Sequence, residues 1–217
     1  MMFDWNFAFS ILPDLVKASR ITIIVTSASF FLALIGGLII LGLRFSKHPL
    51  ISKIVAQLVD FIRGTPLLVQ VFFIYYITPE FGLTLGPIET GILALSVHYS
   101  CYMSEAYRSA MFSIPKGQWE AARALGLKPQ IVFSKIIWPQ MQPLIVPIGG
   151  SYLVYMFKDT PILAAITVRE LLQVSAQIGA DNFRYMEPLT IVGVLFLIMS
   201  MAAAFIIRRI ERAVKIP

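Results

Sequence analysis

Long uncharged apolar stretches alternate with short polar intervals along this chain of 217 residues. The stretches 21–43, 136–157 and 188–207 can each cross a bilayer as a helix, which takes about 20 residues. Two shorter apolar runs, 64–78 and 90–104, complete a span when their flanking residues are added. The pattern predicts an all-α integral membrane protein with about five transmembrane helices in a single transmembrane domain, 1–217.

The ends and breaks of these spans follow from particular residues. In residues 1–16, aromatic side chains lie between acids, which is typical of a segment at the outer membrane interface. Gly64-Thr65-Pro66 interrupts the second span, and such a break is tolerated in lipid where protein or water covers the backbone. A plain proline kink is the alternative. Asp60 and Arg63 are spaced to pair just before this break.

A second irregular stretch, 159–187, is expected to form an extracytoplasmic gate loop. It contains Thr167-Val168-Arg169-Glu170, the pattern of a capping box, in which the Thr hydroxyl and the Glu carboxylate satisfy opposite backbone amides. The pattern predicts a helix from Val168 to about Ile178 that Gly179 stops. Such a helix is too short to span and suits an outer gate or a re-entrant lid.

The longest polar interval, 112–137, predicts a short helix between two spans. Pro115 suits the first position of a helix, where no N–H is needed. Glu120 is spaced to pair with Lys116 or Arg123 on the helix surface. Neighbouring alanines favour helix and leave little bulk, and Gly126 is placed to end it. From spacing alone, a docking helix and an ordinary loop with one helical turn are equally good interpretations.

Composition and charge indicate the class of protein and the orientation of the chain in the membrane. The chain is 58% hydrophobic and 14% charged, with a net charge of +6. The basic residues follow the first span, surround 112–137 and close the chain, so they fall on one side of the membrane if five helices alternate. The positive-inside tendency then places the N-terminus outside and the C-terminus in the cytoplasm. This distribution argues against nucleic acid as a partner, and no cleavable signal peptide is evident.

Few residues suggest reaction chemistry. The single cysteine, Cys101, falls within the third span and is interpreted as a packing residue. His48 and His98 stand apart in the sequence, so no metal site is expected, and no catalytic cluster of convincing spacing is found. The chain also lacks a Gly-x4-Gly-Lys-Ser/Thr loop, so ATP would have to bind elsewhere. These residues therefore predict a protein that is not an enzyme.

The third span carries polar groups at membrane depth, which normally face protein or a cavity. His98 and Tyr102 share one helix face, and so do Tyr99 and Tyr102. Hydrogen bonding between helices and the lining of a substrate path are both open interpretations. Glu105 and Arg108 are expected to pair near the inner end of this span.

The interval 112–137 resembles the EAA loop of binding-protein-dependent ABC importer permeases. The resemblance rests on Glu120-Ala121-Ala122, Gly126 and Pro139, with Trp138 where the family usually has Leu. It implies a type I ABC importer permease fold, with a cytoplasmic coupling helix that sits in a groove of the ATP-hydrolysing subunit. The ATPase-coupling residues that it implies are Trp119, Glu120, Ala121, Ala122, Leu125 and Gly126.

Two further stretches resemble the polar amino-acid branch of these permeases. Residues 63–70, Arg-Gly-Thr-Pro-Leu-Leu-Val-Gln, match a segment of that branch. Residues 155–161, 165–172 and 182–190 most resemble the D subunit of ectoine and hydroxyectoine permeases. The branch usually has Lys-Asp-Thr-Ser at 158–161 and an Asn about seven residues earlier; this chain has Pro161, and Ser151 near the Asn position.

The resemblance implies a bacterial inner-membrane importer of a compatible solute such as ectoine. Its expected partners are a second permease subunit, a cytoplasmic ATPase dimer that binds ATP and Mg²⁺, an extracytoplasmic substrate-binding protein, and membrane lipid. The second permease subunit is most simply a sister chain in a heterodimer, although a homodimer also fits. A permease for glutamine, glutamate, histidine or arginine and an ion-driven secondary transporter are the alternatives. Ectoine is a zwitterion, and aromatic faces and carboxylates can hold its cationic part. The substrate-path candidates are Arg63, Thr65, His98, Tyr99, Tyr102, Ser151, Tyr152, Tyr155, Asp159 and Glu187.

Overall fold

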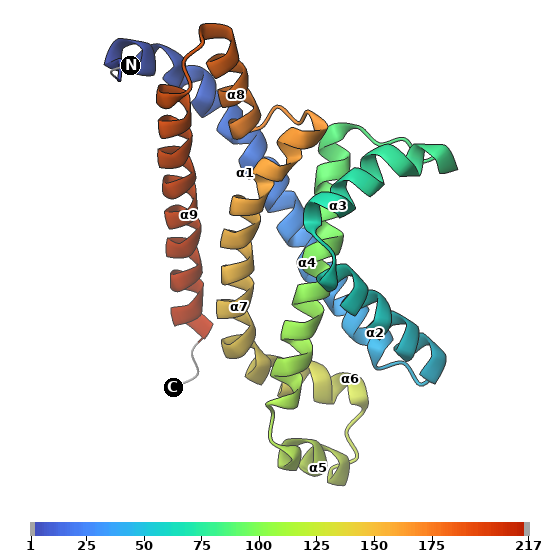
Figure 1. Cartoon of the computed structure of the whole chain (residues 1–217). Coiled ribbons are helices and arrows are strands. Elements are labelled where there is room, and N and C mark those ends of the chain that lie inside the picture. The colour runs from blue at the N-terminus through green and yellow to red at the C-terminus, as the bar shows by residue number, and fades with distance from the viewer. Residues whose placement is uncertain (1–2, 215–217) are drawn as a thin grey trace.

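The computed structural model describes residues 3–214, which are all-helical with no strand in that range (Figure 1). Short 3-10 and π segments, labelled η, join or extend the α-helices. The elements are α1 Trp5–Arg44, α2 Pro49–Gly64, α3 Leu67–Phe72, η1 Phe73–Ile77, η2 Thr78–Phe81, α4 Pro87–Phe112, α5 Lys116–Ala124, α6 Pro129–Ile131, η3 Val132–Ile137, α7 Trp138–Asp159, η4 Thr160–Ile166, α8 Leu171–Asn182 and α9 Met186–Val214.

Three helical stretches of the described chain are long and apolar enough to cross a membrane: Trp5–Arg44, Pro129–Ile166 and Met186–Val214. A fourth span is made by Pro49–Gly64 and Leu67–Phe81, two parts bent by 108° at the break between them. α4 has 26 residues, about 39 Å at 1.5 Å per residue, but its polar side chains lower its hydropathy. Five spans are therefore reached only when the broken pair and α4 are both included.

The first span is longer than the predicted stretch. α1 runs for 40 residues from Trp5 and is capped by Asp4, whose carboxylate accepts hydrogen bonds from the amides of Asn6 (2.9 Å) and Phe7 (3.1 Å). Residues 5–16 thus form the first turns of α1, with Pro13 inside the helix, and no break divides them from the span. In Figure 1 these dark blue turns run across the upper end of the molecule, near the start of α9. Their placement at the outer interface stays a prediction.

α1 and α4 pack closely because glycines in α1 remove bulk at their contact. A Cβ atom on Gly36 would lie 2.2 Å from Ser100 Oγ, and one on Gly37 would lie 2.7 Å from Met103 Cβ. The missing side chains at these two glycines let the backbones of α1 and α4 approach closely. Buried residues of α4 then join two apolar clusters, one on each side of this contact. Leu95 and Tyr99 belong to the outer cluster, and Met103, Tyr107 and Ala110 to the inner one.

The predicted capping box is wrong, because the backbone turns before the helix begins. Thr167 has a left-handed conformation (φ 62°) and ends η4, so its hydroxyl does not cap α8. Glu170 is itself the N-cap, and its two carboxylate oxygens accept from the amides of Leu172 (2.9 Å) and Gln173 (2.7 Å). The helix also passes the predicted stop at Gly179 and ends at left-handed Phe183 (φ 53°).

Glu170 is fully buried at this cap, 0% exposed. Burial raises the pKa of its carboxyl to about 7, against the opposing effect of the two amide donors. The folded protein therefore binds a proton more tightly than the unfolded chain between the ordinary pKa of 4.5 and about 7. Stability falls as pH rises through this window and is level above it.

We expect the melting temperature of the purified complex to drop by several degrees between pH 5 and pH 8, since 1 kcal/mol shifts it by about 2–4 °C at this chain length. In Glu170→Gln this decrease is smaller, because the titrating group is gone. Scanning calorimetry at stepped pH measures it, with the exposed carboxyl variant Glu80→Gln as control. An identical pH profile in Glu170→Gln and the wild type contradicts the interpretation.

A second prediction concerns the α1–α4 contact. Gly37→Val should destabilise the permease by about 1–3 kcal/mol through overpacking, whereas Gly193→Val should not, since nothing lies within 4 Å of a Cβ there. Thermal unfolding of both variants in the same detergent gives the comparison. Equal melting temperatures would show that α1 does not depend on this close approach.

Candidate functional site

α5 lies beyond the ends of α4 and α7, at the lower end of the molecule in Figure 1. Its C-terminus is a Schellman motif: Leu127 N–H donates to the Ala122 carbonyl (3.1 Å), and Gly126 N–H donates to the Arg123 carbonyl (3.0 Å). Gly126 has φ +64°, a conformation that glycine adopts without strain. The predicted end of the helix at Gly126 is confirmed.

One side of α5 packs on the protein and the other is free. Ala122 is 1% exposed, and Trp119 packs against the inner apolar cluster. Glu120 and Ala121 are exposed, and Leu125 is 74% exposed. This free face combines a carboxylate, small side chains and one large apolar side chain, which suits insertion into a partner's groove.

The predicted pairing of Glu120 with Lys116 or Arg123 is wrong within residues 3–214, where Glu120 makes no ion pair. Arg123 instead donates from Nε to the Trp119 carbonyl (3.3 Å), one turn back on its own helix. The carboxylate of Glu120 is therefore available to a positive group outside this chain.

Gln70 joins the two parts of the broken span. Its side-chain amide donates to the Ile62 carbonyl (2.7 Å), to Thr65 Oγ1 (2.8 Å) and to the Thr65 carbonyl (3.1 Å), so it supplies a donor to backbone carbonyls at the break. Its Oε1 atom lies 3.1 Å from His98 Nδ1 in α4. Since the amide nitrogen is used as a donor, Oε1 must accept, and His98 therefore carries its proton on Nδ1. Sequence reasoning left Gln70 out of the site, although an amide four residues after Pro66 at membrane depth pointed to it.

An aromatic cluster extends from His98 across α4 to α7. Tyr99 donates from its hydroxyl to Asp159 Oδ2 at 2.6 Å. The ring of Tyr152 lies 6.0 Å from that of Tyr99 and 5.8 Å from that of Tyr102. Tyr155 continues the cluster, 6.4 Å from Tyr152. The polar faces of α4 and α7 thus meet at one place.

Charged groups border the cluster on the side toward α5. Glu105 is bonded by Arg44 and by Arg108, whose Nη2 lies 2.8 Å away, and Arg63 Nη1 lies 3.8 Å away. The predicted Glu105–Arg108 pair is confirmed. The predicted Asp60–Arg63 pair is wrong for the described residues, because Arg63 turns to Glu105 and lies over the Tyr102 ring at 5.2 Å. The sequence signal that could have assigned Arg44 and Arg63 to this group is their position at the ends of spans, where the carboxylate of Glu105 needs cations.

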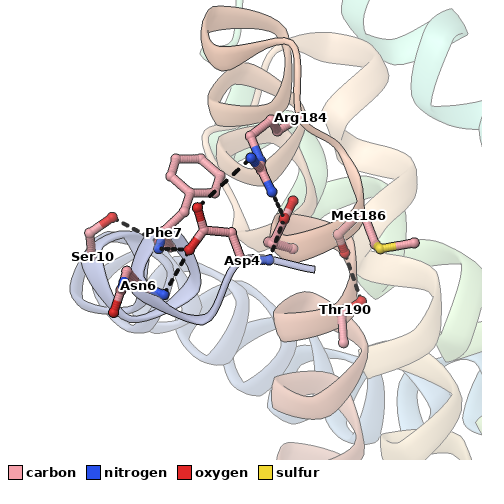
Figure 2. A network of polar contacts seen from close by, with 8 residues as sticks. Asp4, Asn6, Phe7, Ser10, Arg184, Met186 and Thr190 are labelled. Atoms are coloured by element: carbon pink, nitrogen blue, oxygen red, sulfur yellow. Dashed lines mark hydrogen bonds and ion pairs between the residues drawn. The ribbon is translucent and has the colours of Figure 1, made fainter. Parts of the chain in front are cut away.

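Two of the ten substrate-path candidates lie elsewhere. Ser151 donates to the Pro147 carbonyl of its own helix (3.1 Å) and lines a hollow of about 210 Å³ against α9. Glu187 is 2% exposed at the start of α9, where it is bonded by Arg184 and accepts from the Asp4 backbone N–H (3.0 Å). This carboxylate raises the pKa of the Arg184 guanidinium. Figure 2 shows Asp4 and Arg184 facing each other in the same network, which fastens the N-terminus of α1 to α9.

The other eight candidates, together with Gln70, form one continuous site between the broken span, α4 and α7. Their role toward substrate stays a prediction. The cluster offers a carboxylate, a guanidinium and several aromatic faces within one region, which is the chemistry that recognises a small zwitterion. Within residues 3–214 no group of three or more His, Cys, Asp or Glu side chains is placed to hold a metal ion.

Comparison with known proteins agrees with this architecture. The chain is 38% identical over 205 residues to a probable amino-acid ABC transporter permease, y4tG, of Sinorhizobium fredii, covering 94% of this chain and 89% of that one. It is 33% identical to the glutamine transport system permease GlnP of Escherichia coli, with 100% of both chains covered. A crystal structure of an amino acid ABC transporter with histidines superposes with a TM-score of 0.90 at 27% identity, covering 98% of this chain and 100% of that one.

Residues 29–216 match the family described as the inner membrane component of binding-protein-dependent transport systems. That span includes the broken second span, the aromatic cluster and α5. The ion-driven secondary transporter considered from the sequence is not supported by this match. The chain belongs to the family of inner membrane permease components of binding-protein-dependent ABC importers.

Proposed function

We propose that this permease carries a polar amino acid across the bacterial cytoplasmic membrane, with its N-terminus outside and α5 and the C-terminus in the cytoplasm. The observation that carries the substrate class is the Tyr99–Asp159 pair, which faces the aromatic cluster that ends at Arg63. Asp159 offers a partner for an α-ammonium group and Arg63 one for a carboxylate. The rings between them supply apolar and cation-binding faces for the side chain.

This substrate differs from ectoine, which the sequence analysis favoured. The relatives named above are described as amino-acid or glutamine permeases, and they support the polar amino-acid alternative better. Both kinds of substrate are zwitterions, so the residues 155–161 and 182–190 do not separate them by charge. Direct competition in an uptake assay separates them.

ATP and Mg²⁺ bind the partner ATPase in this proposal, because the chain has no phosphate-binding loop of its own. Two permease subunits, most simply this chain and a sister chain, each present one α5 to the ATPase dimer. Closure of that dimer on nucleotide pushes the free face of α5, made by Glu120, Ala121 and Leu125. The Schellman end at Gly126 keeps this force directed along a defined helix. A substrate-binding protein delivers the amino acid from outside.

The substrate assignment is tested by uptake into proteoliposomes that contain the whole complex and its binding protein. Tyr99→Phe and Asp159→Asn should each lower amino-acid uptake about tenfold or more, since a hydrogen bond to a charged group is worth about 1.5–3 kcal/mol. Tyr185→Phe, an exposed tyrosine of the outer loop, is the matched control. Uptake of ectoine in preference to glutamine, glutamate, histidine and arginine would overturn the substrate class.

The coupling role of α5 is tested separately. Glu120→Lys should abolish most uptake and most ATPase stimulation by loaded binding protein, because it reverses the charge on the docking face. Glu211→Lys reverses a charge near the C-terminus, outside α5, and should retain both. A Leu125→Cys variant, labelled with a membrane-impermeant thiol reagent from the cytoplasmic side of vesicles, checks the orientation. Normal stimulated ATPase activity in Glu120→Lys speaks against coupling through this face.

A further inference from the structure

A groove of about 700 Å³ lies where the C-terminal ends of α1 and α4 meet α5. Apolar side chains line nearly all of it, including Leu38 of α1, Phe112 of α4 and Trp119 of α5. Gly42 forms part of its wall, and no atom lies within 4 Å of the place that a Cβ on Gly42 would occupy. The groove is therefore open to a guest from the side where α1 exposes its apolar residues.

Lys116 is the charged residue among the groove's lining side chains. It is exposed at the start of α5, and within residues 3–214 its ammonium group makes no ion pair. An apolar groove that continues from two membrane helices and carries a free cation at α5 complements one class of molecule, a lipid with an apolar chain and an anionic headgroup.

We propose that this groove binds an anionic phospholipid of the cytoplasmic leaflet. One acyl chain lies along Leu38, Gly42 and Phe112, and the phosphodiester contacts the Lys116 ammonium. The leaflet rests on the orientation proposed above, but the binding itself does not, because both leaflets of a test membrane can hold the same lipid. The substrate of the permease plays no part in it.

Such a lipid would touch the coupling helix at the face opposite the partner's docking face. Trp119 lines the groove, while Glu120, Ala121 and Leu125 point to solvent. The guest fills space between α5 and the two membrane helices, so it stiffens the connection through which the motion of α5 reaches α1 and α4. The lipid composition of the membrane would then adjust how strongly ATP hydrolysis drives transport.

The proposal is tested with photoactivatable lipids that carry a diazirine in one acyl chain. The whole complex is placed in nanodiscs with either the phosphatidylglycerol or the phosphatidylcholine probe, and cross-linked peptides are mapped by mass spectrometry. We expect the peptides that contain residues 38–45 and 111–119 to be labelled about fivefold more by phosphatidylglycerol, the preference that one lysine near an anionic lipid provides.

Three variants make the test specific. Gly42→Leu fills the groove and should remove the labelling of both peptides, whereas Gly193→Leu, which also adds a side chain to open space, should retain it. Lys116→Gln should retain labelling but lose the preference for phosphatidylglycerol, and it keeps the test valid if Gly42→Leu fails to assemble. Equal labelling by the two probes in the wild type, absence of lipid labelling on both peptides, or full labelling in Gly42→Leu overturns the proposal. Failure of the amino-acid uptake test or of the cysteine-labelling test of the proposed function leaves these lipid cross-linking readouts unaffected.

Discussion

The architecture depends on how one break in a membrane helix is satisfied. Pro66 and the residues before it end α2, and the chain continues into α3 after a turn of 108°. Carbonyl groups at such a break cannot be left without donors in lipid. The side-chain amide of Gln70 donates to the Ile62 and Thr65 carbonyls, and its own oxygen accepts from His98, so the same side chain satisfies the break and fastens it to α4.

Next to this junction, polar groups of the broken span, α4 and α7 lie in one region. α4 is held against α1 by the close approach at Gly36 and Gly37, which fixes the direction in which its polar face points. Tyr99 then reaches Asp159 at the end of α7, and Arg63 lies over Tyr102 at the end of α2. A carboxylate, a guanidinium and the rings between them are thereby brought together. In the proposed function, this convergence is what would recognise a zwitterionic amino acid.

The end of the molecule that carries α5, which the proposed function assigns to the ATPase contact, is organised differently. α5 is short and exposed, and its own capping defines its end, while Ala122 and Trp119 attach it to the apolar cluster between α4 and α7. Its docking face carries no internal ion pair among the described residues, so its interactions are left for a partner. The groove behind it leaves the opposite face open to lipid as well. α5 is thus positioned to transmit force between a soluble partner and the membrane helices.

The sequence by itself determined the features that rest on local chemistry. Uncharged length identified the apolar spans, Gly-Thr-Pro identified the broken one, and Gly126 identified the end of α5, because each depends on a few neighbouring residues. The Glu105–Arg108 pair was also within reach, since both residues lie one turn apart on one helix. The resemblance of short motifs then gave the family, but it favoured ectoine over the polar amino acid that the relatives support.

Only the tertiary structure decided which partner each polar group takes. Thr167-Val168-Arg169-Glu170 fits a capping box by spacing, but Thr167 ends η4 in a left-handed conformation and Glu170 caps α8 alone. Arg63 lies near Asp60 in sequence and near Glu105 in space, and Glu187 is drawn to Arg184 and the N-terminus of α1 instead of the aromatic cluster. Such choices depend on contacts between helices far apart in the chain. Spacing along one helix fixes which groups can meet, and the packing of whole helices fixes which of them do.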